Sequence, residues 1–126
     1  LITAVTVLTS LDAAQLKVMG LPDDPTTLAV NLAKNAVENG ARAIVCSPLE
    51  ISAVRSAVGN SAVIITPGVR PAEMVGSDDQ QRTMTPEDAI AAGANYVVIG
   101  RPITQSWSKG ALAMKERAQE IGSLLI

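Results

Sequence analysis

Short apolar runs alternate along the chain with longer segments in which apolar residues recur at helical spacing. The runs are rich in β-branched residues and almost continuous in hydrophobicity, which is typical of strands buried on both faces of a parallel sheet. They cover residues 4–8, 43–46, 62–65 and 96–99. The pattern therefore predicts a strand–helix unit that is repeated along the chain.

Capping residues and glycines mark the ends of the predicted helices. A shorter helix is expected from Asp12 to Met19, and a last one from Ala111 to about Leu124. The other boundary signals are Asp24-Pro25 with Gly40, the capping box Ser47-Pro48-Leu49-Glu50 with Gly59, and a second box, Thr85-Pro86-Glu87-Asp88, with Gly93.

Repeated strand–helix units predict an α/β fold with parallel strands and right-handed crossovers. Two architectures fit, an open doubly wound sheet or part of an eight-stranded barrel. A unit of this length cannot close a barrel by itself, and an isolated half would leave two unpaired strand edges. We therefore expect a piece of a larger assembly, with the other half on the same or another chain.

The composition argues against several classes of function. A net charge of −2 gives no electrostatic reason to bind nucleic acid or an anionic membrane. No apolar run approaches the roughly 20 residues of a spanning helix, and the start at Leu1 resembles no signal peptide. With no histidine, the commonest zinc ligand is absent, so we expect no metal. The single cysteine, Cys46, favours a cytoplasmic setting and is expected in the core.

Glycine and arginine follow the third and fourth predicted strands, in Gly68-Val69-Arg70 and Gly100-Arg101. Loops after parallel strands gather at one edge of a sheet, and in barrels the last two such loops often hold a phosphate. Arginine beside a glycine amide offers the charge and donors that a phosphate dianion needs. The pattern therefore predicts a phosphate site, against the alternative that both arginines are solvated surface charges.

Other candidates carry weaker signals. The polar segment 70–85 is long enough to be a functional loop, although a tolerated insertion is the alternative, and Asp78-Asp79 alone is weak evidence for a metal. Thr9-Ser10 offers hydroxyls to a ligand, although Ser10 serves equally as a helix cap. Trp107 is expected to pack or to form an interface.

The same strand ends carry motifs that resemble the bacterial-type orotidine 5′-phosphate decarboxylase family. They match its strands five to eight and the loop after the seventh, in chain order. The matching segments are residues 4–10, 45–47, 66–71, 79–86 and 98–104. The resemblance implies that residues 1–126 are the C-terminal half, strands five to eight, of a single (β/α)8 TIM-barrel domain.

The resemblance also implies a cofactor-free decarboxylation of orotidine 5′-phosphate to UMP in pyrimidine biosynthesis. It assigns the 5′-phosphate to Arg70, Gln80 and the Gly100-Arg101 pair, and the pyrimidine to Thr9. Pro67 would line the pocket beside the substrate carboxylate. Gln81 stands where many relatives carry a basic residue.

The family's catalytic lysine–aspartate array lies in the N-terminal half of its barrel, and no such motif occurs in this chain. We therefore expect no catalytic residue here, inactivity of the chain alone, and a partnership with an N-terminal half in a cytoplasmic homodimer.

Two alternatives stay open. One is another phosphosugar-barrel enzyme, such as a hexulose-phosphate synthase or a ketogulonate-phosphate decarboxylase, against which Thr9-Ser10 and segment 79–86 argue. The other is a non-catalytic phosphate-binding half-barrel that assembles with itself or with a partner.

Overall fold

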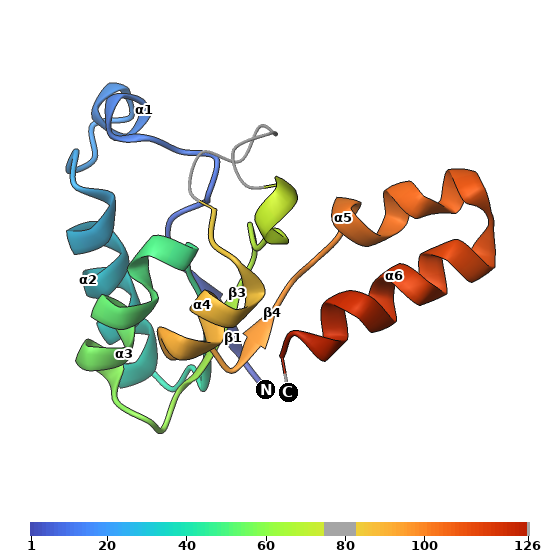
Figure 1. The fold of residues 1–126 in the computed structure, drawn as a ribbon. Coiled ribbons are helices and arrows are strands. Elements are labelled where there is room, and N and C mark those ends of the chain that lie inside the picture. The colour runs from blue at the N-terminus through green and yellow to red at the C-terminus, as the bar shows by residue number, and fades with distance from the viewer. Residues whose placement is uncertain (75–82, 126) are drawn as a thin grey trace.

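The protein forms a four-stranded parallel sheet whose strands lie side by side in chain order (Figure 1). This computed structural model describes residues 1–74 and 83–125. The strands are β1 (Thr3–Val5), β2 (Ala43–Val45), β3 (Val63–Thr66) and β4 (Tyr96–Val97). Each strand pairs in parallel with the next, so β1 and β4 form the two edges of the sheet.

Helices connect the strands and cover one face of the sheet (Figure 1). The α-helices are α1 (Ala13–Val18), α2 (Pro25–Glu38), α3 (Ile51–Val58), α4 (Pro86–Ala91), α5 (Arg101–Thr104) and α6 (Ala111–Ser123). Short 3-10 helices are η1 (Pro48–Glu50), η2 (Ala72–Met74) and η3 (Gln105–Lys109). Helices α2, α3 and α4 pack beside the sheet, whereas α5 and α6 form an arm beyond β4.

The predicted strands and caps are largely confirmed, although β1, β2 and β4 are shorter than their apolar runs and β3 begins and ends one residue later than its run. Asp24 accepts a hydrogen bond from the backbone amide of Thr26 at 3.1 Å, and Thr85 accepts one from that of Asp88 at 3.2 Å. The Glu50 carboxylate accepts from the Ser47 amide at 3.2 Å, as a capping box requires.

Two details of the sequence prediction were wrong. Asp12, not Ser10, caps α1, because its side chain accepts from the Gln15 amide at 2.8 Å while Gln15 accepts from the Asp12 amide at 3.0 Å. In addition, residues 101–109 fold into α5 and η3, which the apolar pattern did not signal. These elements are too short for a helical repeat to emerge.

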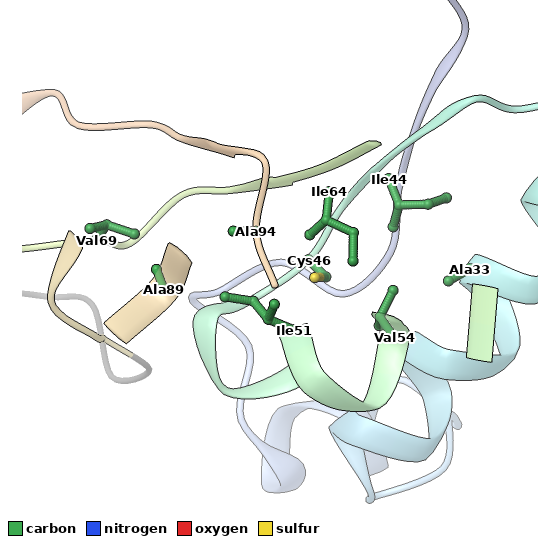
Figure 2. Packing of buried hydrophobic residues seen from close by; sticks show 9 residues of the cluster. All are labelled: Ala33, Ile44, Cys46, Ile51, Val54, Ile64, Val69, Ala89 and Ala94. Atoms are coloured by element: carbon green, nitrogen blue, oxygen red, sulfur yellow. The ribbon is translucent and has the colours of Figure 1, made fainter. Parts of the chain in front are cut away.

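The core lies between the sheet and the helices that cover it. Ile44 and Ile64 point from the strands toward Ile51 and Val54 of α3, and Cys46 is buried among them with 1% exposure (Figure 2). The expected packing role of Cys46 is therefore confirmed. Side chains alternate along a strand, so the neighbours of these residues face the other side of the sheet.

That other face is open. On β4 and just beyond it, Val97 and Ile99 pack against the core, whereas Tyr96 and Val98 are 63% and 51% exposed. At the opposite edge Val5 is 57% exposed. The sheet therefore buries apolar side chains under its helices and leaves apolar side chains uncovered on its second face, as a sector of a larger fold would.

One arginine joins three segments at the amino ends of the strands. Arg55 of α3 donates to the carbonyls of Gly59 and Ala62, both at 2.7 Å, and to the Gly93 carbonyl at 2.9 and 3.2 Å. A further bond reaches the Asn95 amide oxygen at 2.6 Å, which also accepts from the Ile64 backbone amide at 2.8 Å. All the guanidinium donors are used, so this cluster stabilises the fold and has no donor left for a ligand.

We predict that Arg55→Ala lowers the free energy of unfolding by about 2–4 kcal/mol, because several carbonyls, most of them in partly buried hydrogen bonds, lose a charged donor. Arg55→Lys should recover only part of this, since an ammonium lacks the planar fork. Arg42, an exposed arginine that donates to the adjacent Ala41 carbonyl at 3.4 Å, is the matched control. Urea unfolding measures all three, and an Arg55→Ala loss no larger than that of Arg42→Ala would contradict the assignment.

Candidate phosphate-binding site

The loops that carry both candidate arginines begin side by side. Strands β3 and β4 pair in parallel, with Thr66 opposite Val97, and the amide of Val98 donates to the Thr66 carbonyl at 2.8 Å. The pairing thus continues to the point where each chain leaves the sheet. Arg70 and Arg101 therefore follow neighbouring strands on the side of the sheet where the carboxyl ends of the strands lie, which is called the carboxyl edge below. The sequence predicted this placement.

Arg70 is held rigidly and is 5% exposed. Gly68 makes the turn before it with a φ of 79°, a conformation that favours glycine. The Arg70 amide donates to the Met84 carbonyl at 3.0 Å, and its side chain donates to the Val69 carbonyl at 3.0 Å. Because Arg70 is buried, the alternative that it is a solvated surface charge is wrong. A buried guanidinium is costly unless charge or hydrogen bonds compensate it.

Arg101 is exposed and begins α5 directly after Gly100. The Gly100 carbonyl accepts from the amides of Ile103 and Thr104 at 2.9 and 3.1 Å, which fixes the turn that presents Arg101. Within the described part of the chain, and apart from its two chain neighbours, no atom lies within 4 Å of a Cβ atom added at Gly100. The described residues therefore leave space beside the Gly100 backbone.

The other strand ends are joined by threonine hydroxyls. Thr6 donates to the Val45 carbonyl at 2.9 Å, and Thr66 donates to the Cys46 carbonyl at 2.7 Å. These bonds hold the ends of β1, β2 and β3 in register. Thr9 and Pro67, both half-buried, follow β1 and β3 at this same edge.

Buried polar side chains also gather at this edge. Among the residues that the structure describes, those that are polar or charged and buried follow β2, end β3 or lie just after β3: Ser47, Glu50, Thr66 and Arg70. The sequence predicted Glu50 only as a capping residue and missed that it is fully buried. Only its place in the capping box pointed to a structural role for Glu50. Its burial could not be predicted, because it depends on residues that are distant in the sequence.

Several predicted positions lie outside the described residues, namely Asp78, Asp79, Gln80 and Gln81. Within the described ranges no group of three or more His, Cys, Asp or Glu residues is arranged to hold a metal ion. No helix in those ranges is long and apolar enough to cross a membrane. Trp107 is 60% exposed, so it does not pack into the core of the described chain.

Comparison with known proteins identifies relatives of this fold and sequence. Residues 1–115 match the model of the Orotidine 5'-phosphate decarboxylase / HUMPS family. An orotidine 5'-phosphate decarboxylase from Thermobifida fusca is 54% identical over 112 residues, which cover 89% of this chain and 48% of the relative. One from Opitutus terrae is 48% identical over 103 residues, covering 82% of this chain and 44% of the relative.

A solved structure supports the same conclusion. The crystal structure of orotidine 5'-phosphate decarboxylase from Lactobacillus acidophilus superposes with a TM-score of 0.75 at 32% identity, over 98% of this chain and 48% of that one. The chain spans about half the length of the relatives it matches. Its sheet is a half of an α/β TIM barrel, as the family resemblance implied. The chain therefore belongs to the orotidine 5'-phosphate decarboxylase / HUMPS family.

Proposed function

We propose that this chain supplies the phosphate- and pyrimidine-binding half of an orotidine 5′-phosphate decarboxylase, which converts orotidine 5′-phosphate to UMP. The observation that carries the proposal is the position of Arg70 and Arg101 at the ends of adjacent parallel strands in a member of this family. The curated relatives named above are orotidine 5'-phosphate decarboxylases, which disfavours the other phosphosugar enzymes.

In this proposal the phosphate lies between the two loops. Arg70, buried and fixed at both backbone and side chain, forms the rigid side of the site. Arg101 and the open backbone of Gly100 form the accessible side. Guanidinium groups match a phosphate dianion in charge and in paired donors. Gln80, outside the described residues, is assigned to the same phosphate by the family resemblance alone.

Thr9 and Pro67 then complete the substrate site along the edge. They follow β1 and β3, the strands on either side of β2. We assign Thr9 to a polar atom of the pyrimidine and Pro67 to the wall beside the carboxylate that departs. The apolar open face of the sheet fits a partner that supplies the remaining strands, so residues 1–126 are proposed as the C-terminal half of a single domain.

The chemical step itself needs residues from the N-terminal half. The bond between the pyrimidine ring and its carboxylate breaks, carbon dioxide leaves, and the electron pair stays on the ring carbon. In the family resemblance a lysine of the N-terminal half protonates that carbon. This chain contributes by binding the remote phosphate, because binding energy from a non-reacting group can be used to order the site around the reacting one.

We predict that the chain alone does not decarboxylate orotidine 5′-phosphate, whereas the chain joined to the N-terminal half of the Thermobifida fusca relative does. The reason is that the proton donor lies on the missing half while the phosphate site lies here. Loss of substrate absorbance measures the reaction, with each half alone as the control. Activity of this chain alone, or inactivity of a folded chimera, would each contradict the proposal.

We also predict that Arg101→Ala in this chimera lowers kcat/KM for orotidine 5′-phosphate about 100-fold, since a charged hydrogen-bonding partner of about 3 kcal/mol is lost. The same variant should leave the decarboxylation of orotidine, which lacks the phosphate, within about twofold of the unmodified chimera. Arg42→Ala removes an exposed arginine far from this edge and serves as the control. Equal losses on both substrates would refute the phosphate assignment.

A further inference from the structure

Arg117 of α6 joins segments that are far apart in the sequence. Its side chain is 19% exposed, and one guanidinium nitrogen lies 2.5 Å from a carboxylate oxygen of Glu73, 44 positions away. The opposite nitrogen lies 2.8 Å from Glu120 on the same helix. The remaining Nε–H donates to the Pro102 carbonyl at 3.4 Å. A single side chain therefore contacts α6, α5 and η2.

The partners of Arg117 lie beside the two arginines of the proposed phosphate site. Glu73 belongs to η2, in the loop that carries Arg70 out of β3. Pro102 directly follows Arg101 in α5. Arg117 thus connects the loop after β3 to the loop after β4 from outside the site. Among the described residues, its hydrogen bonds reach Pro102, Glu120 and Glu73, and not the two arginines themselves.

The Glu73 and Glu120 side chains are 61% and 65% exposed, and the contact differs from an isolated surface ion pair because one guanidinium serves three acceptors. An isolated exposed pair contributes little, because solvent screens it and both side chains lose freedom. Here Glu120 holds the guanidinium on its own helix, which leaves the other nitrogens oriented toward Glu73 and Pro102. The hydrogen bond from Arg117 keeps the pKa of Glu73 below its ordinary value of 4.5, so the pair is charged at neutral pH.

Arg117 also links the arm of α5 and α6 to η2. Helix α6 packs mainly against α5 and η3, and the arm that they form extends beyond β4 (Figure 1). A contact from this arm to η2 limits how far α5 can move relative to the loop after β3. Two cations that must converge on one anion gain affinity when their separation is fixed before binding.

We propose that Arg117 is a positioning residue that, through Glu73 and the Pro102 carbonyl, sets the separation of the Arg70 and Arg101 loops so that both arginines meet one phosphate. The inference rests on the proposed function of this site and adds a residue that no strand-end motif contains. It would make helix α6 a determinant of affinity for phosphorylated substrates.

The test uses the chimera with the Thermobifida fusca N-terminal half, four single variants and the double variant that combines Arg117→Ala with Glu73→Gln. Arg117→Ala removes the link between the loops, Glu73→Gln removes the charge of its acceptor, and Arg117→Lys retains the charge without the fork. Lys115→Ala is the matched control, because it removes an exposed cation from the same helix. We measure KM and kcat for orotidine 5′-phosphate and for orotidine, and the affinity for inorganic phosphate by calorimetry.

We expect Arg117→Ala and Glu73→Gln to raise KM for orotidine 5′-phosphate about threefold to tenfold, with a matching loss of phosphate affinity. The effects of the two changes should not add when they are combined. Arg117→Lys should recover part of the loss, and Lys115→Ala should change nothing. Orotidine turnover should stay within about twofold for all variants.

Equal losses on orotidine 5′-phosphate and orotidine would overturn the inference, as would a lowered melting temperature with unchanged phosphate affinity. These outcomes would give Arg117 a purely structural role. Failure of the proposed function is distinguishable, because the unmodified chimera would then not decarboxylate orotidine 5′-phosphate. Calorimetry with inorganic phosphate would still decide the positioning role, and an unchanged affinity in Arg117→Ala would reject it.

Discussion

Parallel pairing of neighbouring strands in chain order is the constraint on which the rest of this structure depends. Because β3 and β4 run the same way in adjacent positions, the loops that follow them must leave the sheet at one edge. That arrangement brings Arg70 and Arg101 to neighbouring positions although 30 residues of sequence separate them. The same constraint aligns Thr9 and Pro67 with them, so one topological rule collects every described candidate residue of the site.

The two ends of the strands differ in the residues that they carry: a structural arginine lies at the amino ends, and the candidate phosphate-binding residues lie at the carboxyl ends. At the amino ends of the strands, Arg55 uses all of its donors on carbonyl and amide oxygens and so joins the segments that precede β3 and β4. At the carboxyl ends, buried polar residues and an open glycine backbone surround the candidate arginines. One arginine therefore stabilises the fold, whereas the other two are candidate phosphate-binding residues. The acceptors around each arginine determine its role.

Local features were predictable from the sequence, whereas long-range packing was not. The caps at Asp24 and Thr85 and the burial of Cys46 depend on nearby residues and on apolar pattern, and the structure confirms them. The cap at Asp12 was missed because Ser10, another capping residue, lies two positions away, and α5 was missed because it is too short for a helical repeat to emerge. The Arg117–Glu73 pair could not be predicted, since only the tertiary fold joins residues 44 positions apart. The proposed substrate came from the family resemblance, because no local pattern specifies it.

We propose that Arg70 and Arg101 of this chain bind one phosphate in an enzyme completed by an N-terminal half-barrel. The decisive experiment is a crystal structure of the completed enzyme with UMP. We expect the 5′-phosphate between the two loops, with nitrogen atoms of both guanidinium groups about 3 Å from its oxygens. A phosphate that contacts neither arginine, or a UMP bound away from the carboxyl edge of the sheet, would contradict it.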